Sequence, residues 1–132
     1  MTTKIFEEGR YIGDVVKFEE PEYSRETIVV AKGNGKLEIG AVLEAGTDGK
    51  YKPLSYTEAT TEDNATPAKA GTPAAVLIQN IDTTDEDVRT VAIVRHAVVV
   101  EQELVFNFDD AAVLPDVYAD LKSLGVIVRK GE

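Results

Sequence analysis

The stretch that decides the fold is ETIVVAKGNGKLEIGAVLEAGTDGKYKPL, residues 26–54, in which runs of aliphatic residues alternate with glycine-containing turns. ETIVVA, residues 26–31, is typical of a strand, and GNG at 33–35 predicts a turn after it. Asp48 and Gly49 form a dipeptide that favours a hairpin turn. The stretch therefore predicts several short strands joined by tight turns.

Two residues inside this stretch limit how its strands can pair. Gly40 interrupts KLEIGAVLEA, residues 36–45, at a point where a bulge or a sharp bend fits. Pro53 has no backbone N–H to donate, so it marks YKPLSY, residues 51–56, as an edge strand.

The rest of the chain continues this pattern of short strands. The polar segment at 57–73 predicts a surface loop, and AAVLIQNI at 74–81 predicts a buried strand. TVAIVRHAVVVE at 90–101 predicts one long strand because it is rich in β-branched residues. VIVR at 126–129 predicts a last strand.

One helix is predicted near the C-terminal end, within residues 109–125. Pro115 suits the first turn of a helix, and Gly125 suits the position just past its end. Spacings of four and three residues give the helix one apolar stripe, made of Val117, Leu121 and Leu124. Many short strands, one late helix and no alternation of strand and helix predict a mainly-β domain.

Residues 1–22 differ from the rest, and we expect them to form an extended arm ahead of a β-rich domain at 23–132. YIGDVVKF at 11–18 has the composition of a strand. Pro21 favours an extended conformation for the residue before it. The segment is thus suited to pair with a partner strand, although completing a sheet of its own domain, or of a neighbouring subunit, is the alternative.

Composition excludes several classes of function. The chain has 132 residues and 14.3 kDa, the size of one domain. Its net charge of −10 disfavours binding to nucleic acids and to anionic membranes. It has no cysteine, which excludes disulfides and thiolate metal sites. The first residues lack the apolar core of a secretory signal, so we expect synthesis in a cytoplasm.

No arrangement of residues in the sequence predicts catalysis or a cofactor. His96 is the single histidine, lies in a predicted strand and has no serine in a nucleophile motif to activate. The acidic run at 82–87 could offer oxygens to calcium from Asp82, Asp85 and Asp87. It lacks the glycine and the final glutamate of a calcium loop, so we favour a solvated connection between strands.

Several motifs together resemble the head decoration proteins of lambda-like bacteriophages. In that family a valine-rich strand leads through a glycine turn to L-x-x-G-x-V-L and then to G-K-Y. The matching positions here are Leu37, Gly40, Val42, Leu43, Gly49, Lys50 and Tyr51. PAAVLIQNIDTT, VAIVRHAVVVE with Arg95, and LKSLGVIVRKG also resemble family segments. The resemblance covers nearly the whole chain.

The resemblance implies a virion structural protein with a small β-clip-like domain, one C-terminal helix and an N-terminal arm. Such a protein binds the outer surface of the expanded capsid as a homotrimer, stabilises it, and uses neither a catalytic site nor a cofactor. Its partner is the major capsid protein of the same phage. The arm residues expected to bind the capsid are Tyr11, Ile12, Val15, Val16 and Phe18.

Other classes remain open from the sequence. One is another oligomeric β-module of a phage, such as a tail or baseplate accessory or a carbohydrate-binding domain. The absence of tryptophan weakens the carbohydrate-binding alternative. Another is an enzyme with a similar fold, such as a trimeric nucleotide hydrolase, for which the sequence shows no acidic metal motif and no nucleotide pocket.

Overall fold

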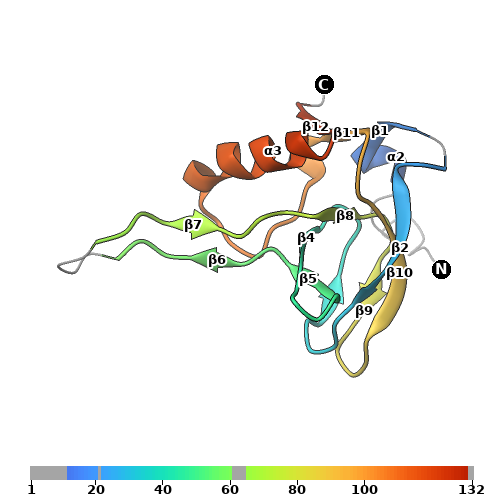
Figure 1. Ribbon diagram of the computed structural model, residues 1–132, viewed down its shortest axis with the longest axis horizontal. Coiled ribbons are helices and arrows are strands. Elements are labelled where there is room, and N and C mark those ends of the chain that lie inside the picture. The colour runs from blue at the N-terminus through green and yellow to red at the C-terminus, as the bar shows by residue number, and fades with distance from the viewer. Residues whose placement is uncertain (1–11, 21, 61–64, 131–132) are drawn as a thin grey trace, which may run out of the picture.

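Five short strands close into a barrel that forms the body of the protein (Figure 1). This computed structural model describes residues 12–20, 22–60 and 65–130. Around the barrel the strands follow the order β10-β2-β5-β4-β8. Their bounds are β2 (Arg25–Val30), β4 (Val42–Ala45), β5 (Tyr51–Pro53), β8 (Ala75–Leu77) and β10 (Val88–Ile93).

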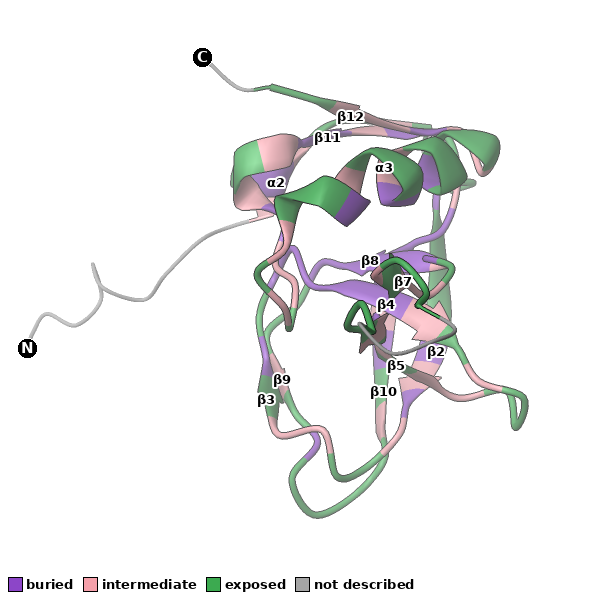
Figure 2. Ribbon diagram, turned by 90° about the vertical axis from the view of Figure 1, so that its left-hand side faces the viewer, coloured by how far each residue is buried: buried purple, intermediate pink, exposed green. Residues whose placement is uncertain are grey.

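A second layer covers one end of the barrel (Figures 1 and 2). It contains a three-stranded sheet of order β1-β11-β12, in which β1 is antiparallel and β12 parallel to β11. The helix α3 lies beside this sheet. The bounds are α2 (Ile12–Val15), β1 (Val16–Glu19), β11 (Ala97–Val100), α3 (Leu114–Ser123) and β12 (Val126–Arg129), with 3-10 turns η1 (Glu101–Glu103) and η2 (Ala111–Val113) between β11 and α3.

Two short ladders complete the fold. One pairs β3 (Lys36–Leu37) with β9 (Ile81–Asp82), and the other pairs β6 (Tyr56–Thr57) with β7 (Lys69–Ala70). In the described residues 39% of positions are in strands and 18% in helices. The predicted mainly-β fold with one C-terminal helix is therefore confirmed.

Two of the barrel strands, β4 and β8, bury apolar residues on both of their faces. In β8, Ala75 and Leu77 belong to the core inside the barrel, whereas Val76 between them belongs to the core under the second layer. Leu43 and Val42 in β4 divide between the two cores in the same way. Because successive side chains of a strand point to opposite faces, one strand connects the two cores.

The helix α3 forms where the sequence predicts it. Pro115 lies in its first turn, and Gly125 follows its end with φ +86°. Val117 and Leu121 are fully buried in the core under the second layer, and Leu124 packs against that core. Figure 2 shows the buried side of α3 turned toward the barrel and its exposed side turned away. The predicted apolar stripe is confirmed.

The strand predicted as an edge at Pro53 is not an edge strand. β5 pairs with β4 on one side and, at Tyr51, with β2 on the other. The pairing with β2 ends at Tyr51, so Pro53 lies beyond it and is not required to donate a hydrogen bond there. A proline is tolerated inside a closed barrel because the second ladder of its strand is so short.

The single long strand predicted at 90–101 is wrong, because the chain bends between β10 and β11. Val94 donates its N–H to the carbonyl of Ser24 at 2.8 Å, and Ala97 donates to Gly125 at 3.1 Å. His96 between them has a left-handed backbone with φ +52°. The bend takes the chain out of the barrel ladder with β2 and into the upper sheet, where β11 pairs with β1 and β12.

Residues 12–20 of the segment that we expected to be an arm pack on the body of the protein. They form α2 and β1, and β1 pairs with β11. Val15 has no exposed surface and belongs to the main core. The apolar residues among 12–20 therefore pack against a strand of their own domain. For these residues this is the alternative given above, in which the segment completes a sheet of its own domain.

Candidate interaction surfaces

The outer edge of β1 is a candidate surface for binding a partner. Among the described residues β1 pairs with β11 alone, so its other edge offers backbone groups to solvent. Phe18 projects from this strand with 57% of its surface exposed, a large exposure for an aromatic ring. An open groove of about 320 Å³ lies beside it and includes Ile12, Val16 and Lys17. Within the described part of the chain, this edge thus combines a strand without a second partner strand with apolar side chains.

The exposed edge strand β1 contains a β-bulge. The pairing of β1 with β11 shifts between Val16 and Phe18, which leaves Lys17 as the extra residue. Lys17 is exposed, and its ammonium group donates to the carbonyl of Gly13 at 3.1 Å. Bulges and lysines on edge strands hinder indiscriminate pairing with other chains. These two features limit the strands that can be added at this edge.

The five predicted binding residues separate into different environments. Tyr11 lies outside the described residues. Val15 is fully buried, and Ile12 and Val16 pack against the main core. Phe18 alone of the four described residues is exposed.

An ion pair fixes the end of β1 to the start of β2. The guanidinium group of Arg25 donates to both carboxylate oxygens of Glu19, at 2.7 and 2.8 Å. The hydrogen bond from Arg25 lowers the pKa of Glu19, and Glu19 in turn raises the pKa of Arg25. Because both side chains are partly solvated, this pair positions the edge more than it stabilises the fold.

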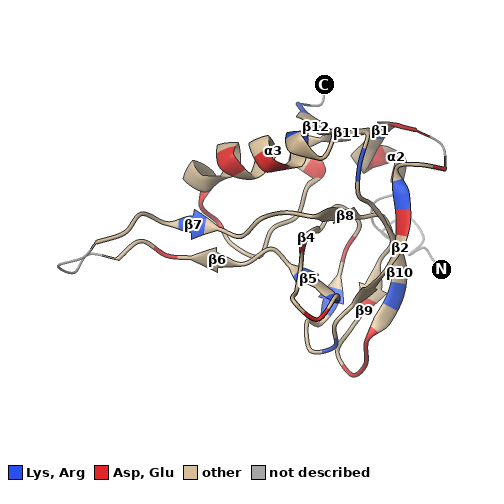
Figure 3. Cartoon of the chain, in the orientation of Figure 1, with Lys and Arg blue, Asp and Glu red and all other residues tan. Residues whose placement is uncertain are grey.

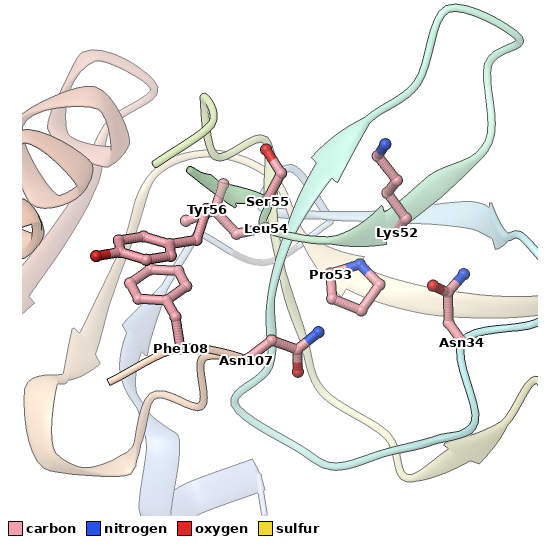
Figure 4. A pocket seen from close by; sticks show the side chains of 8 residues that line it. All are labelled: Asn34, Lys52, Pro53, Leu54, Ser55, Tyr56, Asn107 and Phe108. Carbon is pink, nitrogen blue, oxygen red and sulfur yellow. The ribbon is translucent and has the colours of Figure 1, made fainter. Parts of the chain in front are cut away.

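A second candidate surface is an open pocket of about 410 Å³ at the base of β6 (Figure 4). Tyr56 and Phe108 stack on one side of it, with ring centroids 4.7 Å apart and planes at 17°. Asn34 and Asn107 lie on other sides, and Lys52 forms an ion pair with Glu44 at 3.6 Å. The sequence analysis did not single out these residues, because they come from distant segments.

The hydroxyl group of Tyr56 fixes this aromatic pair. It donates to a carboxylate oxygen of Asp110 at 2.5 Å, which raises the pKa of Tyr56 to about 12. Asp110 also accepts the N–H of Ala112 and so caps the turn that leads into α3. Tyr56 therefore links the start of β6 to the segment before the helix.

The serine and histidine side chains do not form a nucleophile and base. Ser24 is buried and donates to the backbone carbonyl of His96 at 2.6 Å, not to its ring. Ser55 donates to Glu44, and Ser123 donates to the carbonyl of Ala119. The ring of His96 lies edge-on to Tyr23, with centroids 4.8 Å apart.

The acidic residues at 82–87 stabilise turns by accepting hydrogen bonds and forming an ion pair. Asp82 accepts the N–H and the hydroxyl group of Thr84, which lowers its pKa. Asp87 pairs with Lys50 at 2.8 Å and accepts the N–H of Lys32. In the part of the chain that the structure describes, no group of three or more His, Cys, Asp or Glu side chains could hold a metal ion. Nor is any helix there long and apolar enough to cross a membrane.

The described residues form a small β-domain with an apolar side chain exposed on an edge strand, a feature that favours binding to other protein chains. The family model of bacteriophage lambda head decoration protein D matches residues 5–126, and the chain belongs to this family. No curated protein and no solved structure matches the chain. Membership makes the protein a structural component of the phage head that binds the capsid.

Proposed function

We propose that this protein binds the outer surface of the expanded phage capsid as a trimer and cements neighbouring capsid subunits. The observation that carries the proposal is the match to the head decoration family over residues 5–126. Its partner is the major capsid protein of the same phage. This role requires affinity and rigidity and involves no catalysis, cofactor, nucleic acid or membrane.

We propose that the N-terminal segment, residues 1–22, attaches the protein to the capsid. Tyr11, Ile12, Val15, Val16 and Phe18 are the residues of this segment that we expect to bind the capsid. Releasing residues 12–20 from the body would expose Val15, at a cost of about 1.5–3 kcal/mol, and would also break the pairing with β11. Attachment is therefore easier if β1 stays in place, offers its free edge to a capsid strand and inserts Phe18.

Three copies of this edge on one trimer act together. A partner strand gains backbone hydrogen bonds along β1 and specificity from the side chains at alternate positions. Each contact can be weak, because linked sites raise the effective concentration and can strengthen overall binding by about 10²–10⁴-fold. A trimer can thus bind firmly through three modest contacts.

The experiment that tests the proposal is sedimentation of the purified protein with expanded capsids that lack decoration. We expect the wild-type protein to sediment with the capsids and Phe18→Ser to bind at least tenfold more weakly with an unchanged melting temperature. Tyr23→Ser is the matched control, because Tyr23 is the other large apolar side chain that is strongly exposed among the described residues, at 47%, and it lies outside β1. A wild-type protein that stays in the supernatant refutes the proposed function, and equal binding by Phe18→Ser refutes the role of the edge.

A further inference from the structure

The segment predicted as a polar surface loop at 57–73 contains a projecting hairpin of β6 and β7 (Figure 1), and an open pocket lies at the base of this hairpin (Figure 4). The volume of the pocket, about 410 Å³, falls within the range of sites that hold small molecules. The role proposed above for β1 does not use this pocket.

One wall of the pocket is aromatic and already in place. Tyr56 stacks on Phe108, and the ring of Phe106 lies against Phe108 with centroids 5.4 Å apart. The hydrogen bond from the hydroxyl group of Tyr56 to Asp110 fixes the position of this wall. Leu54, which is buried in the main core, adds further apolar surface to the lining. A ligand therefore meets a rigid apolar wall.

Two amide side chains face the ligand from other segments. The NH₂ group of Asn34 donates to the carbonyl of Ala31 at 2.9 Å, so its own side-chain oxygen is left to accept a hydrogen bond. The side chain of Asn107 is exposed and forms no hydrogen bond within the described part of the chain. Its amide therefore offers both donors and an acceptor to a ligand.

The charge of the pocket favours a neutral ligand. None of the eight described residues that line it is acidic, although the chain has 24 acidic residues. Figure 3 shows acidic residues along α3 and in loops of the body. Among the lining residues Lys52 is the one cation, and it pairs with Glu44 at 3.6 Å. An anionic ligand would thus find no unpaired positive charge there, and a cationic ligand no lining carboxylate.

A sugar has the chemistry that matches these groups. The faces of a pyranose ring carry C–H groups that pack on aromatic rings, and its hydroxyl groups both donate and accept, as amides do. The chain has no tryptophan, and Tyr56 with Phe108 provides the aromatic surface here. A peptide strand is less suited, because β5 already pairs with β4 and Pro53 has no N–H to offer a further strand.

We propose that this pocket binds one neutral sugar unit, with the sugar ring on the wall of Tyr56 and Phe108 and its hydroxyl groups on Asn34 and Asn107. Binding is weak, because an open pocket that holds about 12 non-hydrogen atoms supports a dissociation constant of about 1–10 mM. β6 and β1 lie on different sides of the protein (Figure 1), so attachment through β1 keeps the pocket out of that contact. Many copies on one phage head would then bind a glycan-covered surface together.

The test is saturation-transfer difference NMR with methyl glucoside, methyl galactoside and N-acetylglucosamine, each at up to about 50 mM, several times the expected dissociation constant. We expect transfer to the ring C–H protons of at least one of these sugars. Asn107→Ala should bind it at least fivefold more weakly at an unchanged melting temperature, because Asn107 is exposed. Lys122→Ala, on the exposed side of α3, should bind as the wild type does. No transfer to any of the three sugars overturns the inference, and so does equal binding by Asn107→Ala.

A second variant tests the aromatic wall. Phe108→Leu keeps an apolar side chain beside Tyr56 but removes the stacked ring. It should also bind the sugar at least fivefold more weakly, with its fold checked by circular dichroism. Wild-type affinity in a folded Phe108→Leu contradicts the role of the wall.

Sedimentation with expanded capsids separates a sugar from a capsid segment as the occupant. We expect Asn107→Ala to sediment as the wild type does, and loss of sedimentation would show that the pocket contacts the capsid and that the inference is wrong. A wild-type protein that binds the sugar but not the capsid refutes the proposed function and leaves this inference intact. Retention of decorated capsids on beads that carry the sugar identifies a surface glycan as its source. Binding of the free sugar without retention identifies a free sugar, and the pocket assignment stands in both cases.

Discussion

Replacing Leu121 by alanine tests the core between α3 and the barrel. Leu121 has no exposed surface and lies in the core with Val117 and Val126. The substitution removes three buried carbon atoms, which at roughly 0.8 kcal/mol each accounts for about 2.4 kcal/mol. The cavity left behind raises the loss to about 3–4 kcal/mol. This is a large part of the ~5–15 kcal/mol that stabilises a domain.

The expected change in melting temperature follows from the size of the protein. Unfolding entropy is about 2.1 cal/mol/K per residue, or roughly 0.28 kcal/mol/K for this chain, so the loss corresponds to about 10–14 °C. Thermal unfolding followed by circular dichroism measures it, with both proteins at one concentration because an oligomer melts in a concentration-dependent way.

Lys122→Ala is the matched control for this experiment. Lys122 is the next residue of α3 and is exposed, and alanine is a good helix former, so its melting temperature should change by no more than about 2 °C. A decrease smaller than about 3 °C in Leu121→Ala would show that the side chain is not packed as described. A similar decrease in both variants would mean that the helix, and not its buried stripe, determines the result.

Two further predictions concern the backbone and the hairpin base. Gly125→Ala should destabilise the protein by about 1–3 kcal/mol in urea unfolding, because φ is +86° and a Cβ would lie 3.1 Å from the backbone nitrogen of His96. Gly13→Ala is its control, since nothing lies within 4 Å of a Cβ there, and an equal loss would contradict the argument. Tyr56 and Tyr118 both have a pKa raised to about 12, so in absorbance titration one of these two late steps should disappear in Tyr56→Phe, because the carboxylate of Asp110 raises the pKa of Tyr56. The folded pKa exceeds the unfolded value of about 10, so this stabilisation is complete below pH 10 and is lost as pH rises to about 12. Loss of a step near pH 10, with the steps near pH 12 unchanged, would refute the hydrogen bond.

The elements that could be predicted from the sequence have local causes. A left-handed glycine, such as Gly49 at φ +84°, marks a turn wherever it occurs, and Pro115 and Gly125 bound a helix without help from the rest of the chain. The apolar stripe of α3 is also local, since its members lie within two turns of one another. These signals give the mainly-β fold and its C-terminal helix.

The elements that could not be predicted depend on distant segments. The bend at His96 follows a run of β-branched residues with no glycine or proline, so nothing nearby indicates it. From the sequence alone, Val15 is predicted to belong to an unpaired strand, because its partners in the core, such as Val99, lie far along the chain. From the sequence the hairpin of β6 and β7 is predicted as a loop, because its threonines and alanines lack the apolar face of a buried strand.

The projecting hairpin of β6 and β7 and the exposed strand β1 lie toward opposite ends of the protein (Figure 1). Tyr56 fixes the direction of the hairpin through Phe108 and Asp110, and β1 is fixed through β11 and Arg25. Because β1 is ordered before it binds a partner, little conformational entropy is lost on binding. A trimer of the proposed kind would therefore present three rigid β1 edges at fixed spacing, which is the condition for their affinities to multiply.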